Sequence, residues 1–382
     1  MKVLMINSVC GIRSTGRICT DTADHFMREG HECRIAYGRE SVPEKYRSIS
    51  YRIGNEWQVR WNGAKARIFD NEGLNAKRAT KVFLRWATAY DPDLLWLHNL
   101  HGYYINYELL FEWIKSRPQM QVRWTLHDCW AFTGHCSHFS FVGCQQWING
   151  CAHCPQTREY PKCIGISACK KNYFRKKHAF CGVSDMSLIT PSRWLAEIVK
   201  QSFLKNYPVE VIHNRIDTEI FCPVYGNFRE KYGLQDKKIV LGVASAWGER
   251  KGLPDFVKLA ERLGTAYAVV LVGIDEATKK RLPSSIVCIS RTDSASALAE
   301  IYTAADVFVN LTYEDTYPTV NLEAQACGTP CLTYRTCGSV ESVLPENVAE
   351  QGDLAAMAAM IQRICGGKYE ENLVLRNGVQ SV

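Results

Sequence analysis

Long apolar runs are missing from this sequence. No stretch approaches the roughly 20 apolar residues that a membrane-spanning helix needs. The N-terminus, MKVLMINSVCG, has only a short apolar run that leads into a Gly/Ser/Thr turn, so we expect a buried first strand and no signal peptide. The sequence therefore predicts a cytoplasmic protein without a transmembrane helix.

Several catalytic signatures are also missing. A zinc deaminase needs H-x-E followed by P-C-x-x-C, whereas this chain has HDC at 127–129 and a proline that follows its C-x-x-C. The glycines after the first strand do not form G-x-G-x-x-G, and no carboxylate pair at glycosidase spacing is evident. These absences exclude a deaminase and argue against hydrolysis by paired carboxylates.

Size and composition indicate a globular protein of two domains. The 382 residues exceed what one hydrophobic core usually supports, and 46% hydrophobic with 22% charged residues is ordinary for a soluble chain. The 17 cysteines are odd in number and accompany no export signal, so we expect reduced thiols. Eight of them lie between Cys129 and Cys181, too concentrated to be small apolar fillers.

Positive charge is concentrated in the first half. Residues 1–185 hold 26 Lys and Arg against 16 Asp and Glu, a net charge of +10, whereas the remainder is at −3. A basic half suggests an anionic partner such as lipid headgroups, a diphosphate or nucleic acid; scattered surface lysines are the alternative.

Short apolar runs alternate with helical patterns along the chain. Strand-like runs such as 3–7, 94–99, 239–245 and 306–312 are separated by amphipathic segments, which indicates α/β domains with parallel sheets covered on both faces. Because the alternation restarts after the cysteine-rich region, we predict two facing, doubly wound Rossmann-like domains that share a ligand cleft. They would span 1–185 and 186–382, with an irregular insert at 129–181 and the final helix packing back on the first domain.

The most informative stretch is ADVFVNLTYEDTYPTVNLEAQACGTPC at 305–331. It predicts a strand, an acidic-aromatic turn, and a helix that opens near Pro318 and closes at Gly328. The first amides of that helix, including those of Thr319 and Val320, would lie at its positive dipole end. The sequence therefore predicts an anion site at this helix start.

Two carboxylates accompany that helix start. Asp315 lies in the turn and Glu323 lies inside the helix, eight residues later. A carboxylate accepts two hydrogen bonds from a ribose diol, so a glutamate near an anion site suits the recognition of a nucleotide.

The pattern YEDTYPTVNLEAQACGTPCLTY resembles the acidic-x7-acidic signature of retaining glycosyltransferases of family 4, which have the GT-B fold. Further motifs agree in order and spacing: GVASAWGERKGLPDF, VLVG, LAEIYTAADVFVNLT, TPSRWLAEIVKQS and VIHNRIDTEIFCP. LHNLHGYYIN and TLHDCWAFTGHC resemble the branch that acts in polysaccharide assembly, including colanic-acid-type transferases. The resemblance covers nearly the whole chain.

The resemblance implies roles for the residues of the second domain. Glu323 would hold the ribose of a nucleotide-sugar donor, and Asp315 would take the first acidic position, for which Glu314 competes. Arg250 and Lys251 would face the donor diphosphate and neutralise the charge that develops on the leaving group.

In the first domain the resemblance implies that His127 contacts the donor sugar near the reacting carbon. Gly11 and Gly16 would let the backbone approach phosphate or acceptor. A buried core role for His127 and a simple turn for the two glycines are the alternatives.

The chain departs from the family pattern at two positions. Pro318 stands where the family often has glycine, and it has no N–H to offer a sugar hydroxyl. The arginine that commonly precedes the Lys-Gly pair is absent, since that position is about Ala246, and Arg250 would supply the charge. The implied chemistry is a retaining hexosyl transfer in which the leaving phosphate helps to deprotonate the acceptor, with no metal or cofactor required.

The insert itself suggests a structural role. Cys136, Cys144, Cys151 and Cys154 are spaced C-x7-C-x6-C-x2-C, and four thiolates would close a tetrahedral zinc site that pins the irregular segment. Free thiols, a disulfide or an iron–sulfur cluster are the alternatives, and a histidine would be able to replace one cysteine; the candidates are His135, His138 and His153.

The basic run KKNYFRKKH at 170–178 suits anionic lipid headgroups, a diphosphate acceptor or nucleic acid. We therefore expect a glycosyltransferase that acts on a glycan or polyprenyl-diphosphate-linked acceptor at the inner face of a membrane, with no nucleic-acid partner. A sugar-nucleotide epimerase of the same fold and a zinc-stabilised nucleic-acid-binding module are the alternative functions.

Overall fold

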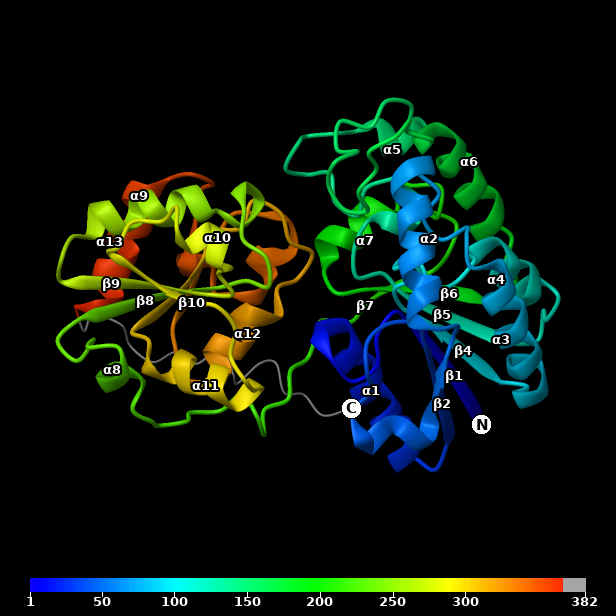
Figure 1. Ribbon diagram of the computed structural model, residues 1–382, viewed down its shortest axis with the longest axis horizontal. Coiled ribbons are helices and arrows are strands. Elements are labelled where there is room, and N and C mark those ends of the chain that lie inside the picture. Colours follow the sequence, from blue (N-terminus) through cyan, green and yellow to red (C-terminus); the bar gives the residue numbers. More distant parts are fainter. Residues whose placement is uncertain (367–382) are drawn as a thin grey trace. The chain divides into compact units, whose positions relative to one another are not determined.

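Two parallel β-sheets organise the computed structural model, which describes residues 1–366 (Figure 1). The seven-stranded sheet lies in a first unit, Met1–His213, and the six-stranded sheet in a second unit that begins at Asn214. The expected pair of doubly wound α/β domains is confirmed. The cleft that they were expected to share stays a prediction.

The border between the units is later in the chain than the predicted 185/186 boundary. Met186–Thr190 (β6) pairs with Gln121–Thr125 (β5), and Val209–Val211 (β7) pairs with β6, so both strands extend the first sheet. The apolar run at 188–192 was interpreted as the start of a second domain, although it is the sixth strand of the first. The linker instead follows His213.

The first sheet has the order β3-β2-β1-β4-β5-β6-β7. The strands in the middle of this sheet, at 2–7 and 94–97, are almost entirely buried on both faces, which explains why they read as continuous apolar runs. The remaining strands are Lys2–Asn7 (β1), Glu32–Tyr37 (β2), Ser50–Arg52 (β3) and Leu94–Leu97 (β4). The helices are Arg13–Arg28 (α1), Glu56–Phe69 (α2), Lys77–Tyr90 (α3), Tyr107–Lys115 (α4), Gln146–Asn149 (α5), Cys169–Phe180 (α6) and Arg193–Val199 (α7).

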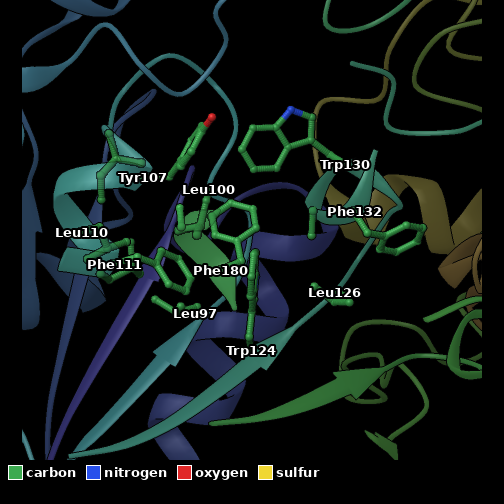
Figure 2. Packing of buried hydrophobic residues seen from close by; sticks show 14 of the residues in the cluster. Leu97, Leu100, Tyr107, Leu110, Phe111, Trp124, Leu126, Trp130, Phe132 and Phe180 are labelled. Carbon is green, nitrogen blue, oxygen red and sulfur yellow. The ribbon is translucent and has the colours of Figure 1, made fainter. Parts of the chain in front are cut away.

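The helices cover the two faces of this sheet unequally. Alternate residues of β1 point to opposite sides, so Val3 and Met5 share a core with α1, while Leu4 and Ile6 join a larger core. That larger core also receives side chains of α2, α3, α4 and α6 (Figure 1). Figure 2 shows its aromatic centre, where the ring of Phe180 lies 4.6 Å from that of Phe111 and 4.9 Å from that of Trp124.

The second sheet has the order β10-β9-β8-β11-β12-β13. Its strands are Lys238–Val243 (β8), Tyr267–Val272 (β9), Ile286–Ile289 (β10), Val307–Asn310 (β11), Cys331–Tyr334 (β12) and Val348–Ala349 (β13). Its helices are Phe228–Lys231 (α8), Leu253–Leu263 (α9), Glu276–Lys279 (α10), Ala295–Ala304 (α11), Thr319–Ala326 (α12) and Leu354–Cys365 (α13).

The last described helix, α13, belongs to the core of the second unit. Met357 and Ile361 are fully buried there together with residues of α9 and β11. The expectation that a final helix packs back on the first domain falls on residues 367–382, which lie outside the described part of the chain. No helix within residues 1–366 is both long and apolar enough to cross a membrane.

Candidate functional site

The second sheet reverses its strand order between β8 and β11. These two strands are neighbours, with Val240 opposite Val307, and the later strands of each half continue outward from them. In open parallel sheets, ligands bind beyond the carboxyl ends of the strands at such a reversal. Arg250 and Lys251 lie in the loop after β8, Glu314 and Asp315 lie in the loop after β11, and the remaining motif residues of the second unit lie on α12.

The loop after β8 contains a short 3-10 helix, Glu249–Lys251, and lies against the end of β11. The amide of Tyr313 donates to the carbonyl of Arg250 at 2.9 Å. Gly252 has a φ of +70°, and a Cβ added there would lie 2.1 Å from the carbonyl oxygen of Leu311. Only glycine allows this approach, so the Lys-Gly pair brings Lys251 to the switch point.

We expect Gly252→Ala to destabilise the protein by at least about 2 kcal/mol, because alanine is strained at this φ and its methyl group collides with backbone. Urea unfolding would measure the change. Gly248→Ala is the matched control in the same loop: its φ is 179° and nothing lies within 4 Å of the added Cβ. Equal unfolding midpoints for the two variants would contradict this account of the loop.

The four charged residues expected at this site lie together. The ammonium of Lys251 is 2.6 Å from Oδ2 of Asp315, and Nη1 of Arg250 is 3.5 Å from the carbonyl oxygen of Glu314. The side chain of Glu314 is buried at 1% exposure. Of the two candidates for the first acidic position, Asp315 is therefore the one whose carboxylate pairs with the lysine.

Helix α12 begins beside this ion pair. Pro318 is its N-cap and Gly328 follows its end with a φ of +83°, so the predicted limits are confirmed. Thr319 and Val320 are partly buried at its first two positions, where backbone amides have no acceptor within the helix. Together with the helix dipole these amides favour an anion.

Buried amides fix the position of this helix. Nδ2 of Asn310, the last residue of β11, donates to Oδ1 of Asn321 at 2.8 Å, and Nδ2 of Asn321 donates to Oγ of Ser342 at 2.8 Å. Sequence analysis missed both asparagines. Asparagine at the end of an apolar strand run was the available signal, since a buried amide needs partners.

Glu323 lies in the interior of the second unit with an exposure of 3%. The hydroxyl of Tyr302, on α11, donates to its Oε2 at 3.1 Å. The carboxylate is thus held by a phenol that sequence analysis did not connect with it. Its assignment to a ribose stays a prediction.

The first sheet reverses its order between β1 and β4, and Gly11 lies in the loop after β1. Gly11 has a φ of +69° and donates its amide to the carbonyl of Gly16 at 3.1 Å. A Cβ at Gly16 would lie 3.1 Å from Cγ2 of Val9 and 3.3 Å from the amide nitrogen of Gly11. The pair closes a tight loop, as in the turn alternative, and the Gly11 amide is used within it.

His127 follows β5 and pairs with a second histidine. Its Nε2 lies 3.0 Å from Nδ1 of His98, which follows β4, and the two rings stack with centroids 5.3 Å apart. Burial lowers the pKa of His127 to about 4 and lowers that of His98 well below its usual value. Both imidazoles are therefore neutral near pH 7.

This burial predicts a loss of stability on mild acidification. Between pH 6.5 and about 4 the unfolded chain protonates His127 while the folded chain does not, so stability falls as the pH is lowered through this window. The shift corresponds to a loss of up to about 3 kcal/mol below pH 4. Unfolding free energies across this range should be flatter in His127→Asn, whereas His25→Asn, on the exposed side of α1, should follow the wild type. If the unfolding free energies of wild type and His127→Asn changed with pH in parallel, protonation of His127 would not be the cause of the stability loss.

Sequence analysis also missed a contact between a histidine and an aspartate. Nε2 of His101 lies 2.8 Å from Oδ2 of Asp128, and Nδ1 lies 2.8 Å from the hydroxyl of Tyr160 in the insert. Burial alone would raise the pKa of Asp128, but His101 outweighs it and the pKa falls to about 2. The HD dipeptide at 127–128 was visible, but its distant partners were not.

The described part of the chain does not show the expected zinc centre, which stays a prediction. Within residues 1–366, no three His, Cys, Asp or Glu side chains are grouped closely enough to hold a metal ion. Sγ of Cys151 instead accepts the amide of Gly134 at 3.1 Å. Cys136, Cys144 and Cys154 are likewise free thiols, so the thiol alternative describes the structure better than the four-thiolate centre.

Polar side chains hold the insert in place instead. Asp70, 3% exposed at the end of α2, binds His135 and accepts from Ser167 Oγ at 2.9 Å and from the Ala168 amide at 2.7 Å. The ammonium of Lys176 donates to the carbonyls of Trp130 and Thr133 at 2.6 and 3.1 Å. The insert is therefore pinned, as expected, but by a carboxylate and an ammonium.

The same contacts remove two cations of the basic run at 170–178 from the exposed surface, whereas Lys170, Lys171 and Lys177 stay exposed. Lys176 is buried at 2% exposure, and Arg175 forms two hydrogen bonds of 2.7 Å with Glu108. An electrostatic patch for lipid or nucleic acid on α6 is accordingly weaker than the sequence suggested.

Known proteins are similar to this chain over parts of its length. Residues 225–375 match the family model described as glycosyl transferases group 1. WcaC of Escherichia coli K12, a glycosyl transferase assigned to colanic acid biosynthesis, is 26% identical over 232 residues, which cover 57% of this chain and 55% of that protein. The D-inositol 3-phosphate glycosyltransferase of Mycobacteroides abscessus is 27% identical over 157 residues, or 37% of this chain and 34% of that protein. The matches thus span about half the length of these curated relatives or less.

Solved structures share the fold over nearly the whole chain. The sucrose-phosphate synthase of Thermosynechococcus elongatus has a TM-score of 0.64 at 15% identity and covers 96% of this chain and 90% of its own. Anabaena Alr3699/HepE, solved in complex with UDP and glucose, has a TM-score of 0.64 at 14% identity with the same coverage. Most of the second unit is therefore similar to group 1 glycosyl transferases, and the resemblance of the chain to colanic-acid-type glycosyltransferases of the GT-B fold is confirmed as a similarity.

Proposed function

We propose that this protein is a retaining hexosyltransferase that moves a sugar from a nucleotide-sugar donor to a glycan acceptor in polysaccharide biosynthesis. The observation that carries the proposal is the contact of Lys251 with Asp315 beside the start of α12, at the strand reversal of the second sheet. The similarity to WcaC supports a role in polysaccharide assembly. The UDP bound by Alr3699/HepE supports a nucleotide diphosphate as the ligand of this fold.

In this proposal the donor diphosphate binds at the start of α12. The amides of Thr319 and Val320 donate to phosphate oxygens, and Lys251 and Arg250 supply positive charge. Lys251 is held by Asp315 and is therefore already oriented before the donor arrives. Preorganised charge of this kind stabilises the pyrophosphate as the bond to the sugar breaks.

The leaving phosphate also serves as the base in the proposed mechanism. The acceptor hydroxyl attacks from the face that the diphosphate leaves, which retains the anomeric configuration, and passes its proton to a phosphate oxygen. The side chains of Arg250 and Lys251, with the helix dipole, perform the charge stabilisation that a divalent metal performs in other transferases. The chemistry therefore requires no metal and no organic cofactor.

The first unit would bind the acceptor. The same unit would contact the donor sugar near the reacting carbon through a neutral His127, because an imidazole held by its partner His98 suits hydrogen bonding to a sugar hydroxyl. We propose a glycan or a polyprenyl-diphosphate-linked glycan as the acceptor, with the protein at the inner face of a membrane. The net charge of +10 over residues 1–185 supports an anionic surface as its surroundings.

A thermal-shift panel of UDP, GDP and ADP tests the donor site. One of the three should raise the melting temperature of the full chain, and the shift should be lost in Glu323→Ala. Release of that nucleoside diphosphate from its sugar conjugates that depends on an added glycan acceptor would then establish transfer. If none of the three produced a shift, the proposed donor site would be wrong.

A further inference from the structure

Helix α2 has its large apolar side chains on its exposed side. Trp57, Trp61, Ala64 and Ile68 recur at the i, i+4, i+7, i+11 spacing of one helical stripe, and the exposed fractions of Trp57, Trp61 and Ile68 are 78%, 64% and 51%. The buried side of α2 instead contains Asn62, Gly63 and Ala66. A helix normally buries its bulkier apolar face. Large apolar side chains on the exposed face of α2 are typical of a surface that contacts a protein or a membrane.

The exposed stripe continues beyond the helix. Phe69, at the end of α2, is 61% exposed. The amide of Ile164 in the insert donates to the carbonyl of Arg67 at 2.7 Å, which places Ile164 and Ile166 beside the last turn. These two isoleucines are 70% and 89% exposed. The apolar surface is thus built by two segments that lie far apart in the sequence.

Cations are interleaved with this apolar stripe. The guanidinium of Arg60 lies 5.6 Å from the centre of the Trp57 ring, and the ammonium of Lys65 lies 5.4 Å from that of Trp61. Over the two helices α2 and α3 the sequence has seven Lys and Arg and a single acidic residue, Glu56. Aromatic rings flanked by cations are typical of segments that lie in the interface of a bilayer.

Helix α3 adds a cationic groove to the same helical layer. Both helices contribute to the large core on one face of the first sheet, so their outer sides face away from it (Figure 1). A groove of about 940 Å³ runs along α3 with Val82, Leu84 and Trp113 as its apolar part. Its basic rim consists of Lys77, Arg78, Lys81 and Arg85.

We propose that the outer surface of α2 and α3, defined by the Trp57–Trp61–Ile68 stripe and the α3 cations, docks on an anionic lipid bilayer. The aromatic side chains enter the headgroup region and the lysines and arginines bind lipid phosphates. This proposal adds a membrane-binding surface to the proposed function. It rests on the proposed function only in assuming a lipid-linked acceptor. It also moves the membrane surface from the 170–178 run to α2 and α3.

Flotation of the full chain with vesicles tests the proposal. Wild-type protein should float with phosphatidylcholine vesicles that contain phosphatidylglycerol and much less with phosphatidylcholine alone. The double variant Trp57→Ala/Trp61→Ala should bind the anionic vesicles at least tenfold more weakly. Tyr225→Ala, which removes an aromatic side chain that is 89% exposed in the second unit, is the matched control and should float like the wild type.

The nucleotide-induced thermal shift is measured on the same variants. A retained shift in the double variant shows that it is folded and separates failure of docking from failure of the proposed function. Absence of flotation by the wild type, or equal flotation of the wild type and the double variant, would overturn the bilayer proposal. Gel filtration showing a wild-type dimer that the double variant loses would assign the surface to a second copy of the chain instead.

Discussion

Turnover of the nucleotide-sugar donor should fall roughly 10²- to 10³-fold in Lys251→Ala. Among the residues described, Lys251 is the one lysine that the loop after β8 contributes beside the start of α12. Its ammonium lies 2.6 Å from Oδ2 of Asp315, which orients it. The ammonium is oriented before the reaction begins. Its removal therefore removes stabilisation of the leaving diphosphate that mobile water molecules replace poorly. The loss should appear in kcat more than in KM, because charge on the diphosphate grows toward the transition state.

Lys258→Ala is the control for the lysine. Lys258 lies on α9, in the helix that follows the same loop, and its side chain is exposed. This variant should keep wild-type kcat, since it removes the same net charge at a distance from the donor site. If Lys258→Ala and Lys251→Ala reduced kcat equally, a local role for Lys251 would be untenable.

Donor affinity should fall roughly 10- to 100-fold in Glu323→Ala. Hydrogen bonds to a charged group each contribute about 1.5–3 kcal/mol, and 1.4 kcal/mol corresponds to a factor of ten in Kd. The carboxylate lies on α12 inside the second unit, where little water competes for it. Calorimetric titration with the nucleoside diphosphate that gives the thermal shift would measure the change.

Tyr302→Phe separates binding by Glu323 from its structural bond. This variant removes the 3.1 Å hydrogen bond to Oε2 and leaves the carboxylate in place. We expect its donor affinity to stay within about threefold of the wild type, with a stability loss of about 1 kcal/mol. If Glu323→Ala bound the nucleotide with wild-type affinity, Glu323 would have only a structural role as the partner of Tyr302.

Local signals in the sequence predict several elements of the second unit. Pro318 and Gly328 predict the limits of α12 because proline suits a helix start and glycine the left-handed residue after its end. The continuous apolar runs predict parallel strands because the strands of a parallel sheet are buried on both faces. Lys251 and Asp315 were placed near one another through the family motifs, and their 2.6 Å contact lies where those motifs converge.

Long-range partners account for what the sequence did not reveal. The 188–192 run reads as a strand in either domain, and only its pairing with β5 assigns β6 to the first sheet. Cysteine spacing suggested zinc, yet the insert is held by Asp70, a residue that lies 65 positions before His135. The stripe on α2 has an ordinary amphipathic spacing, and periodicity alone does not tell which side of a helix is buried.

A crystal structure with the nucleoside diphosphate bound would test the central claim most directly. We expect the diphosphate at the start of α12, within hydrogen-bond distance of the Thr319 and Val320 amides and of the Lys251 ammonium. A diphosphate bound elsewhere, with the Lys251–Asp315 pair and the helix start making no contact with it, would contradict the account.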